Sequence, residues 1–212
     1  MNSNTKQVLQ TLNILRKMYP DAPATYLNHT NAFEMLIATL LSAHTTDASV
    51  NKVTPILFKK YPNASRLAKA SINDLIQIIR SVGTYNRKSE YIKQAASLLE
   101  EKFNGEVPRT IGELVILPGV SRKTANVVLS VIYGINEGVV VDTHIGRVTQ
   151  RLGISTQKTP EKIEKDLMEI LPNNRWYEYA RLAGAHGRNI CFAKKPRCPD
   201  CDLNHLCPSA QL

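Results

Sequence analysis

The sequence predicts an all-α protein, and three observations carry that prediction. Apolar residues recur at spacings of three and four, as on one face of a helix, between Val8 and Leu15 and between Phe33 and Leu41. Helix start and stop signals alternate along the chain. The one run of β-branched residues, Val139-Val140-Val141, is too short and isolated to build a sheet. We therefore expect a succession of short helices.

Helix starts are predicted where a side-chain oxygen is followed three residues later by an acid, because the oxygen can cap the first free amides. Three such pairs occur: Asn31 with Glu34, Ser71 with Asp74, and Thr110 with Glu113. Thr159 followed by Pro160 is a fourth start signal, and Asp47 is interpreted as the cap of a helix that Pro55 kinks or ends. Helix ends are predicted where glycine can adopt a left-handed conformation, at Gly83, Asn104-Gly105, Gly134 and Gly153.

The composition is that of a globular protein with a basic surface. The 212 residues are 43% hydrophobic and 21% charged, which excludes intrinsic disorder. Lys and Arg number 27 against 18 Asp and Glu, a net charge of +9, so polyanions are the expected partners. Nucleic acid is the first interpretation of this charge, and an anionic membrane surface is the second.

The N-terminal run MNSNTKQVLQ lacks the basic stretch and apolar segment of a targeting signal. No segment approaches the roughly 18 consecutive apolar residues of a membrane span. We therefore expect a protein without a membrane anchor in the cytoplasm or nucleus, associated with the nucleoid if the cell is prokaryotic.

A candidate DNA-binding hairpin follows the helix that Thr110 begins. The run from Leu117 to Val128, LPGVSRKTANVV, places a Pro-Gly turn directly before an apolar helix. Glycine lets the backbone approach a ligand closely, and amides at the positive end of the next helix can bind a phosphate. The candidate contacts are Gly119, Val120, Ser121 and Arg122. A plain corner between two helices is the alternative interpretation.

All four cysteines lie near the C-terminus, with the spacing Cys191-x6-Cys198-x2-Cys201-x5-Cys207. A reducing compartment favours a metal site over disulfides. Zinc modules usually pair two short knuckles and this run has one, so a four-thiolate [4Fe-4S] cluster fits better. A structural zinc, with His205 as a substitute ligand, is the alternative. Lys194, Lys195 and Arg197 crowd the loop between the first two cysteines and are candidate phosphate contacts.

Several motifs together resemble the endonuclease III family of base-excision DNA glycosylases, in the helix-hairpin-helix superfamily. They are LLSAHTTDASVNK from Leu40, NGEVP from Asn104, LPGVSRKTANVVL, VDTHIGRV from Val141, and the cysteine pattern. The resemblance spans nearly the whole chain in the same order.

The resemblance implies two lobes with DNA bound in the cleft between them. One is a six-helix barrel over residues 25–135 that includes the helix-hairpin-helix at 110–133; the other combines residues 1–24 and 136–212, with the [4Fe-4S] loop at 191–207. It also implies a monomeric, bifunctional DNA glycosylase and abasic-site lyase acting on double-stranded DNA with damaged bases or abasic sites. Its substrates would be damaged pyrimidines, oxidised ones foremost, and β-elimination would cut the strand.

Lys123 falls where the family has its Schiff-base lysine, although a helical lysine taken alone is an ordinary solvated charge. The helix dipole and Arg122 both disfavour the charged form of its amine. Lowering its pKa from about 10.4 by roughly 3 units needs about 4 kcal/mol, more than the dipole supplies. We therefore expect burial in the cleft to contribute most of that change.

Asp142 matches the catalytic aspartate of the family. There it would deprotonate the incoming amine or stabilise the positive charge on the sugar. Aspartate at this position is also an excellent helix cap, and both roles can hold together. His144 and Arg147 are assigned to packing and phosphate contact.

Three positions depart from the common family pattern. Ser121 replaces a second hairpin glycine, where it can add a capping hydroxyl. His44 stands in place of a glutamine that fills the gap left by an extruded base, and Thr84 in place of an aliphatic wedge. Both are candidate DNA contacts that affect which bases are flipped.

Two rival functions use the same features. One is a monofunctional glycosylase for mismatched thymine or adenine, which would lack the lysine at position 123. The other is a non-enzymatic DNA-binding or redox-sensing module, against which Lys123 and Asp142 together weigh.

Overall fold

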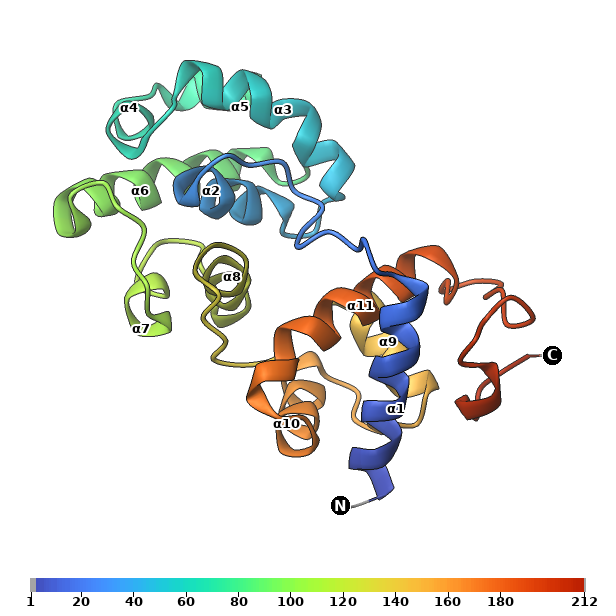
Figure 1. Cartoon of the computed structure of the whole chain (residues 1–212). Coiled ribbons are helices and arrows are strands. Elements are labelled where there is room, and N and C mark those ends of the chain that lie inside the picture. The colour runs from blue at the N-terminus through green and yellow to red at the C-terminus, as the bar shows by residue number, and fades with distance from the viewer. Residues whose placement is uncertain (1–2, 212) are drawn as a thin grey trace. The chain divides into compact units, whose positions relative to one another are not determined.

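The computed structural model describes residues 3–211, and none of these residues lies in a β-strand (Figure 1). The prediction of an all-α fold is confirmed. The chain divides into two compact units, Met1–Ala24 with Asn136–Leu212 and Thr25–Ile135. No helix in the described part of the chain has the length and apolar character needed to cross a bilayer.

The unit Thr25–Ile135, called here the middle unit, contains seven α-helices among its described residues and ends in a π-helical turn, Leu129–Tyr133. The helices are α2 (Ala32–Ser42), α3 (Asp47–Lys60), α4 (Ala64–Ala68), α5 (Ile72–Ile79), α6 (Tyr85–Phe103), α7 (Ile111–Leu114) and α8 (Arg122–Val128). Two of them, α4 and α7, are single turns of five and four residues. Helix α2 is buried along most of its length and packs against α3, α6 and α8, so it is the centre of this core.

Local capping explains where several helices begin. The side chain of Asn31 accepts a hydrogen bond from Glu34 N at 2.9 Å, and that of Thr110 accepts one from Glu113 N at 3.3 Å. Both capping predictions are confirmed. Each cap contributes about 1 kcal/mol because it satisfies an amide that the helix leaves free.

Three capping expectations need correction. Thr46, not Asp47, caps α3, and its side chain accepts from Ser49 N. Pro55 lies inside α3 and does not end the helix, which continues to Lys60. Ser71 makes no side-chain cap bond, and Asp74 instead accepts hydrogen bonds from the side chains of Lys60 and Tyr61. These partners are the last residue of α3 and its C-cap, which a pattern spanning three residues cannot identify.

The other unit, called here the terminal unit, contains α1 (Ser3–Met18), α9 (Thr143–Arg151), α10 (Pro160–Ile170) and α11 (Trp176–Asn189), with two short 3-10 turns. Helix α11 packs closely on α9, because a Cβ on Gly187 would lie only 2.9 Å from that of His144. Helix α1 lies beside α11 (Figure 1) and is joined to it by an ion pair between Arg16 and Glu178. The cysteine loop, residues 191–207, follows α11 directly.

Candidate active site and cysteine pocket

The hairpin, residues 117–121, joins α7 to α8 as a tight turn between two helices. Val120 is buried, and its amide donates to Leu117 O at 3.0 Å. The expectation that this amide faces a phosphate is therefore wrong, because the turn itself uses it. The amides of Gly119 and Ser121 have no hydrogen-bond partner among the described residues. Ser121 caps α8, since its Oγ accepts from Thr124 N at 3.1 Å, so the departure from glycine adds a cap.

Both the backbone conformation at position 119 and the packing of Tyr91 against it require glycine there. Its φ of +80° lies in the left-handed region, and a Cβ there would meet the ring of Tyr91, on α6, at 2.8 Å from Cδ2. The hairpin therefore rests directly on the Tyr91 ring. Because the contact is made by ring carbons and not by a flexible chain end, the turn has little room to adjust.

We expect Gly119→Ala to lower the free energy of unfolding by about 2 kcal/mol, from left-handed strain and displacement of the ring. Gly112→Ala is the control, because no atom lies within 4 Å of a Cβ at that position of α7. Alanine there should be neutral or stabilising by up to about 1 kcal/mol. Urea unfolding of both variants measures the difference, and equal stabilities would contradict the packing described.

Lys123 is the second residue of α8, and its side chain is exposed, as is that of Arg122. Burial of Lys123 in the cleft stays a prediction. Its exposure leaves the amine accessible to a ligand. Lys123 belongs to the middle unit and Asp142 to the terminal unit.

Asp142 caps α9 and has a second oxygen left for another role. Its Oδ1 accepts from His144 N at 2.9 Å and from Ile145 N at 2.8 Å. Its Oδ2 accepts from Arg188 Nη2 at 3.3 Å. The capping interpretation is confirmed, and buried Val141 anchors the segment that delivers the carboxylate. Arg188, from α11, was not predicted, and no sequence signal identifies it.

Arg147 serves the fold and not a phosphate. Its Nε donates to Cys191 O at 2.9 Å, and its Nη2 donates to Gly187 O at 2.8 Å. Its Nη1 donates to Thr143 O at 3.3 Å. This guanidinium ties α9 to the start of the cysteine loop, so the expected phosphate contact gives way to a bracing role. His144 lies against α11, in agreement with the packing role assigned to it.

His44 and Thr84 occupy two exposed turns of the middle unit, and both have left-handed backbones, with φ of 54° and 56°. Such a conformation costs about 1 kcal/mol or more in a non-glycine residue and is a clear outlier for β-branched threonine. The turns adjoin each other, because a Cβ on Gly83 would lie 3.5 Å from Thr45 Oγ1 and 3.7 Å from His44 O. Backbone strain of this kind is concentrated at functional sites.

A buried lysine that the sequence analysis missed holds the His44 turn in place. Lys88 on α6 is 5% exposed, and its Nζ donates to Leu41 O at 2.8 Å and to Thr45 Oγ1 at 2.7 Å. Burial lowers the pKa of this amine. The pattern of α6 offers no signal for it, because its partners lie more than 40 positions earlier in the chain.

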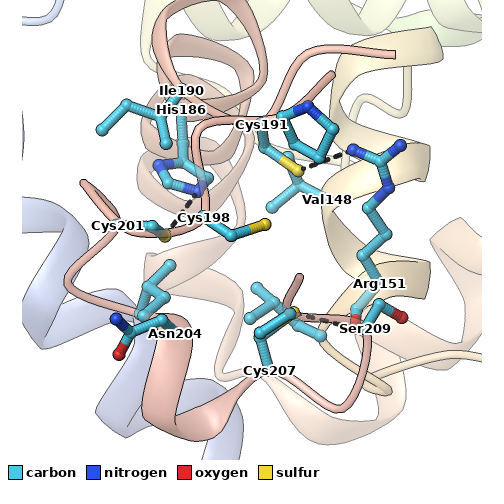
Figure 2. Close-up of a pocket in the computed structure, with 14 residues that line it drawn as sticks. Val148, Arg151, His186, Ile190, Cys191, Cys198, Cys201, Asn204, Cys207 and Ser209 are labelled. Atoms are coloured by element: carbon cyan, nitrogen blue, oxygen red, sulfur yellow. Dashed lines mark hydrogen bonds between the residues drawn. The ribbon is translucent and has the colours of Figure 1, made fainter. Parts of the chain in front are cut away.

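The four cysteines are free thiols that line one pocket in the terminal unit (Figure 2). Burial raises the pKa of the thiols of Cys201 and Cys207, and the charges of the other cysteines raise it further. Four cysteine sulfurs around one pocket fit an iron–sulfur centre, because positively charged iron stabilises thiolates that would otherwise repel one another. Among the described residues, no three His, Cys, Asp or Glu side chains are placed to hold a single metal ion.

Two nitrogen atoms lie against the sulfur atoms of this pocket. Arg151 Nη1 donates to Cys191 Sγ at 3.3 Å, and His186 Nε2 lies 3.6 Å from Cys201 Sγ (Figure 2). Tyr19 Oη lies 3.0 Å from the other ring nitrogen of His186, whose pKa burial lowers to about 4. His205, the expected substitute ligand, is exposed and does not line the pocket. The histidine of the pocket is His186, which precedes the cysteine run by five residues and was not among the predicted ligands.

The basic residues of the cysteine loop divide into two kinds. Lys194 and Lys195 are exposed, and Lys195 has a left-handed φ of 51°. Arg197 instead donates to Asn189 O and lies over the Phe192 ring at 5.7 Å. The two lysines are therefore available to a ligand, whereas Arg197 is partly committed to the loop.

Comparisons with known proteins identify the family. Residues 37–173 match the model of the HhH-GPD superfamily base excision DNA repair proteins. Endonuclease III of Synechocystis is 45% identical over 100% of this chain and 96% of its own, and that of Bacillus subtilis is 42% identical over 98% and 94%. A solved structure of a trapped covalent intermediate between an endonuclease III and DNA matches with a TM-score of 0.92 and 44% identity, covering 99% of this chain and 98% of that one.

Endonuclease III enzymes generally contain an iron–sulfur cluster, which agrees with a pocket lined by four free cysteines. The match includes the hairpin, Lys123 and Asp142 within the family model. On this similarity of sequence and fold, the chain belongs to the endonuclease III family of the HhH-GPD superfamily.

Proposed function

We propose that this protein is a bifunctional DNA glycosylase and abasic-site lyase of base excision repair, acting on double-stranded DNA. The observation that carries the proposal is the full-length similarity to endonuclease III enzymes, one of them trapped covalently on DNA. An exposed lysine in the first turn of the hairpin's second helix provides the nucleophile that such an intermediate needs. Damaged pyrimidines, oxidised ones foremost, are the substrates that we assign.

Lys123 carries the covalent chemistry. Its neutral Nζ attacks the sugar C1′, the bond from C1′ to the base breaks, and the base leaves with its electron pair and gains a proton. The sugar ring opens as the amine forms an imine with C1′. Loss of a proton from C2′ then expels the 3′ phosphate by β-elimination, and water releases the lysine.

Asp142 assists at the step that removes the base. We assign its carboxylate to accept the proton of the incoming amine and to offset the positive charge that builds on the sugar. The cap bonds to Oδ1 fix the orientation of the side chain, and we assign this work to Oδ2, which also accepts a hydrogen bond from Arg188. In this proposal the cap orients the carboxylate for catalysis as well as stabilising the start of α9.

Lys123 is exposed in the protein alone, so bound DNA is what excludes water from its amine. In this proposal the sugar and the extruded base cover the amine when substrate is in place, and Lys123 then acts as the nucleophile.

DNA recognition by the middle unit rests on the hairpin and the two strained turns. The amides of Gly119 and Ser121, with the side chain of Arg122, are assigned to a phosphate. His44 and Thr84 are assigned to the duplex at the extruded base. In the terminal unit, Lys194 and Lys195 provide the phosphate contacts.

We assign a [4Fe-4S] cluster to Cys191, Cys198, Cys201 and Cys207. When bound, the cluster supplies four iron–thiolate bonds that join the ends of the cysteine loop. The chain's own contribution is the hydrogen bond that Arg151 donates to Cys191 Sγ, the contact of His186 with Cys201 Sγ, and the bond that Arg147 donates to Cys191 O. The loop then holds Lys194 and Lys195 rigidly.

Replacing Cys198 by alanine should bleach the yellow-brown protein, lower its content of about four irons, and weaken DNA binding by disordering the loop lysines. His205→Ala is the control and should keep colour and iron, because His205 lies outside the pocket. Iron and zinc analysis with absorption spectra measures both. A colourless, active parent protein with one zinc per chain would overturn the assignment.

The function is tested with four duplexes: one with an oxidised pyrimidine, one with a preformed abasic site, and G:T and A:G mismatches. We expect base release and strand cleavage on the first and cleavage of the second. Release of thymine or adenine from a mismatch, without strand cleavage on any duplex, would favour the monofunctional alternative and contradict the proposal.

A further inference from the structure

Helix α6 connects the parts of the middle unit that we assign to DNA. It begins directly after Thr84, and its Lys88 holds the His44 turn from inside. Tyr91, one turn further along, supports the hairpin through Gly119. The first two turns of α6 therefore lie against every element of this unit to which a DNA contact is assigned.

One cation on this stretch has no charged partner among the described residues. Arg87 is exposed, and among residues 3–211 no carboxylate lies within ion-pairing distance of it. Its Nε donates to Tyr91 Oη at 2.6 Å, and its guanidinium lies over the Tyr91 ring at 5.1 Å from the centroid. Both contacts hold the side chain in place, and neither neutralises its charge.

The Tyr91 ring packs against Gly119, and the guanidinium of Arg87 lies over the same ring. Residues four apart lie on one face of a helix, so Arg87 and Tyr91 share the face that meets the hairpin. Thr84, three residues before Arg87, adjoins that face as the cap of the helix. Arg87 therefore lies on the stretch of α6 that runs from its Thr84 cap to Tyr91 and the hairpin.

We infer that Arg87 binds a DNA phosphate between the Thr84 turn and the hairpin, and that Tyr91 is the positioning residue that orients it. The inference rests on the proposed function, because it needs DNA on this face. An arginine that binds through two parallel N–H groups suits a phosphate, and its Nη groups are not used by Tyr91. Stacking on the ring reduces the side-chain freedom that binding would otherwise remove.

The test compares Arg87→Gln with Lys102→Gln, which removes the same charge from the last turn of the same helix. The two positions are 15 residues apart, or about 22 Å along the helix axis, beyond a Debye length of about 10 Å at 0.1 M salt. Lys102 is exposed, so neither change disturbs the core. The probe is a duplex with a tetrahydrofuran abasic analogue, and fluorescence anisotropy measures its affinity over a range of salt concentrations.

One phosphate contact contributes about 0.9 to the slope of log affinity against log salt. We expect Arg87→Gln to lower that slope by about 0.9 and to weaken binding about eight-fold at 0.1 M salt. Lys102→Gln should match the parent protein, and Arg87→Lys should restore the slope. Equal slopes and affinities for parent, Arg87→Gln and Lys102→Gln would overturn the inference.

The positioning role of Tyr91 has its own readout. Tyr91→Phe keeps the ring against Gly119 but loses the hydroxyl that accepts from Arg87. It should weaken binding in the parent protein and have no effect in Arg87→Gln, whereas a purely structural tyrosine would have the same effect in both. Cleavage of a true abasic site by the parent protein keeps the proposed function separate: if cleavage persists while Arg87→Gln binds normally, only the inference about Arg87 fails.

Discussion

Lys123→Gln should lose strand cleavage at an abasic site by roughly 10³-fold or more, because no other group on α8 can form the imine. Glutamine preserves the length and polarity of an exposed side chain, so the stability of the fold should not change. DNA binding should weaken by less than about ten-fold, since one cation among several phosphate contacts is lost. Single-turnover cleavage and anisotropy measure the two effects separately.

Arg122→Gln is the matched control for this variant. It removes the same charge from the neighbouring exposed position of α8 and leaves the nucleophile intact. We expect weaker binding but near-parental cleavage once the enzyme saturates the DNA. If Lys123→Gln cleaves as fast as Arg122→Gln at saturation, Lys123 is a phosphate contact and not the nucleophile.

Asp142→Asn should excise a damaged base roughly 10²-fold more slowly or worse, the scale of a missing general base. The amide oxygen can still accept from His144 N and Ile145 N, so the cap survives. The ion pair with Arg188 is lost, and because both side chains are partly exposed, this costs about 1 kcal/mol or less. Thermal melting checks that the fold is retained.

The same variant should cleave a preformed abasic site better than it excises a base, because an abasic sugar has no base to expel. Arg188→Gln distinguishes the effect of losing the carboxylate from the effect of losing its ion pair, because it breaks the same ion pair but keeps the negative charge of Asp142. We expect it to retain base excision within about ten-fold. Base release by Asp142→Asn at the parental rate, with normal melting, would reduce Asp142 to a helix cap.

Features defined by neighbours in the sequence could be predicted before the structure. The caps at Asn31 and Thr110 need only residues within three positions, and the turn at Gly119 needs only its own backbone freedom. The helical period likewise predicts that Phe33, Leu36 and Leu40 of α2 are buried, but it does not predict the burial of its other sides. Family resemblance adds the order of motifs, which a single helix cannot supply.

Features defined by distant partners could not be predicted. The donors of Arg147 reach carbonyls 40 and 44 residues away, which turned an expected phosphate contact into a brace. His186 meets Cys201 only because α11 and the cysteine loop fold back on each other. Lys88 was missed because a buried ammonium satisfied by a carbonyl and a hydroxyl leaves no trace in charge patterning. In each case the role of the side chain depends on a contact with residues distant in the sequence, and not on its sequence neighbours.

Borohydride reduction during turnover tests the central claim most directly, because it converts an imine between enzyme and DNA into a stable amine. The parent protein should form a covalent adduct on a duplex with an oxidised pyrimidine, and protease digestion with mass spectrometry should place the modification on Lys123. No adduct should form with Lys123→Gln. An adduct on any other residue, or cleavage without an adduct, would contradict the account.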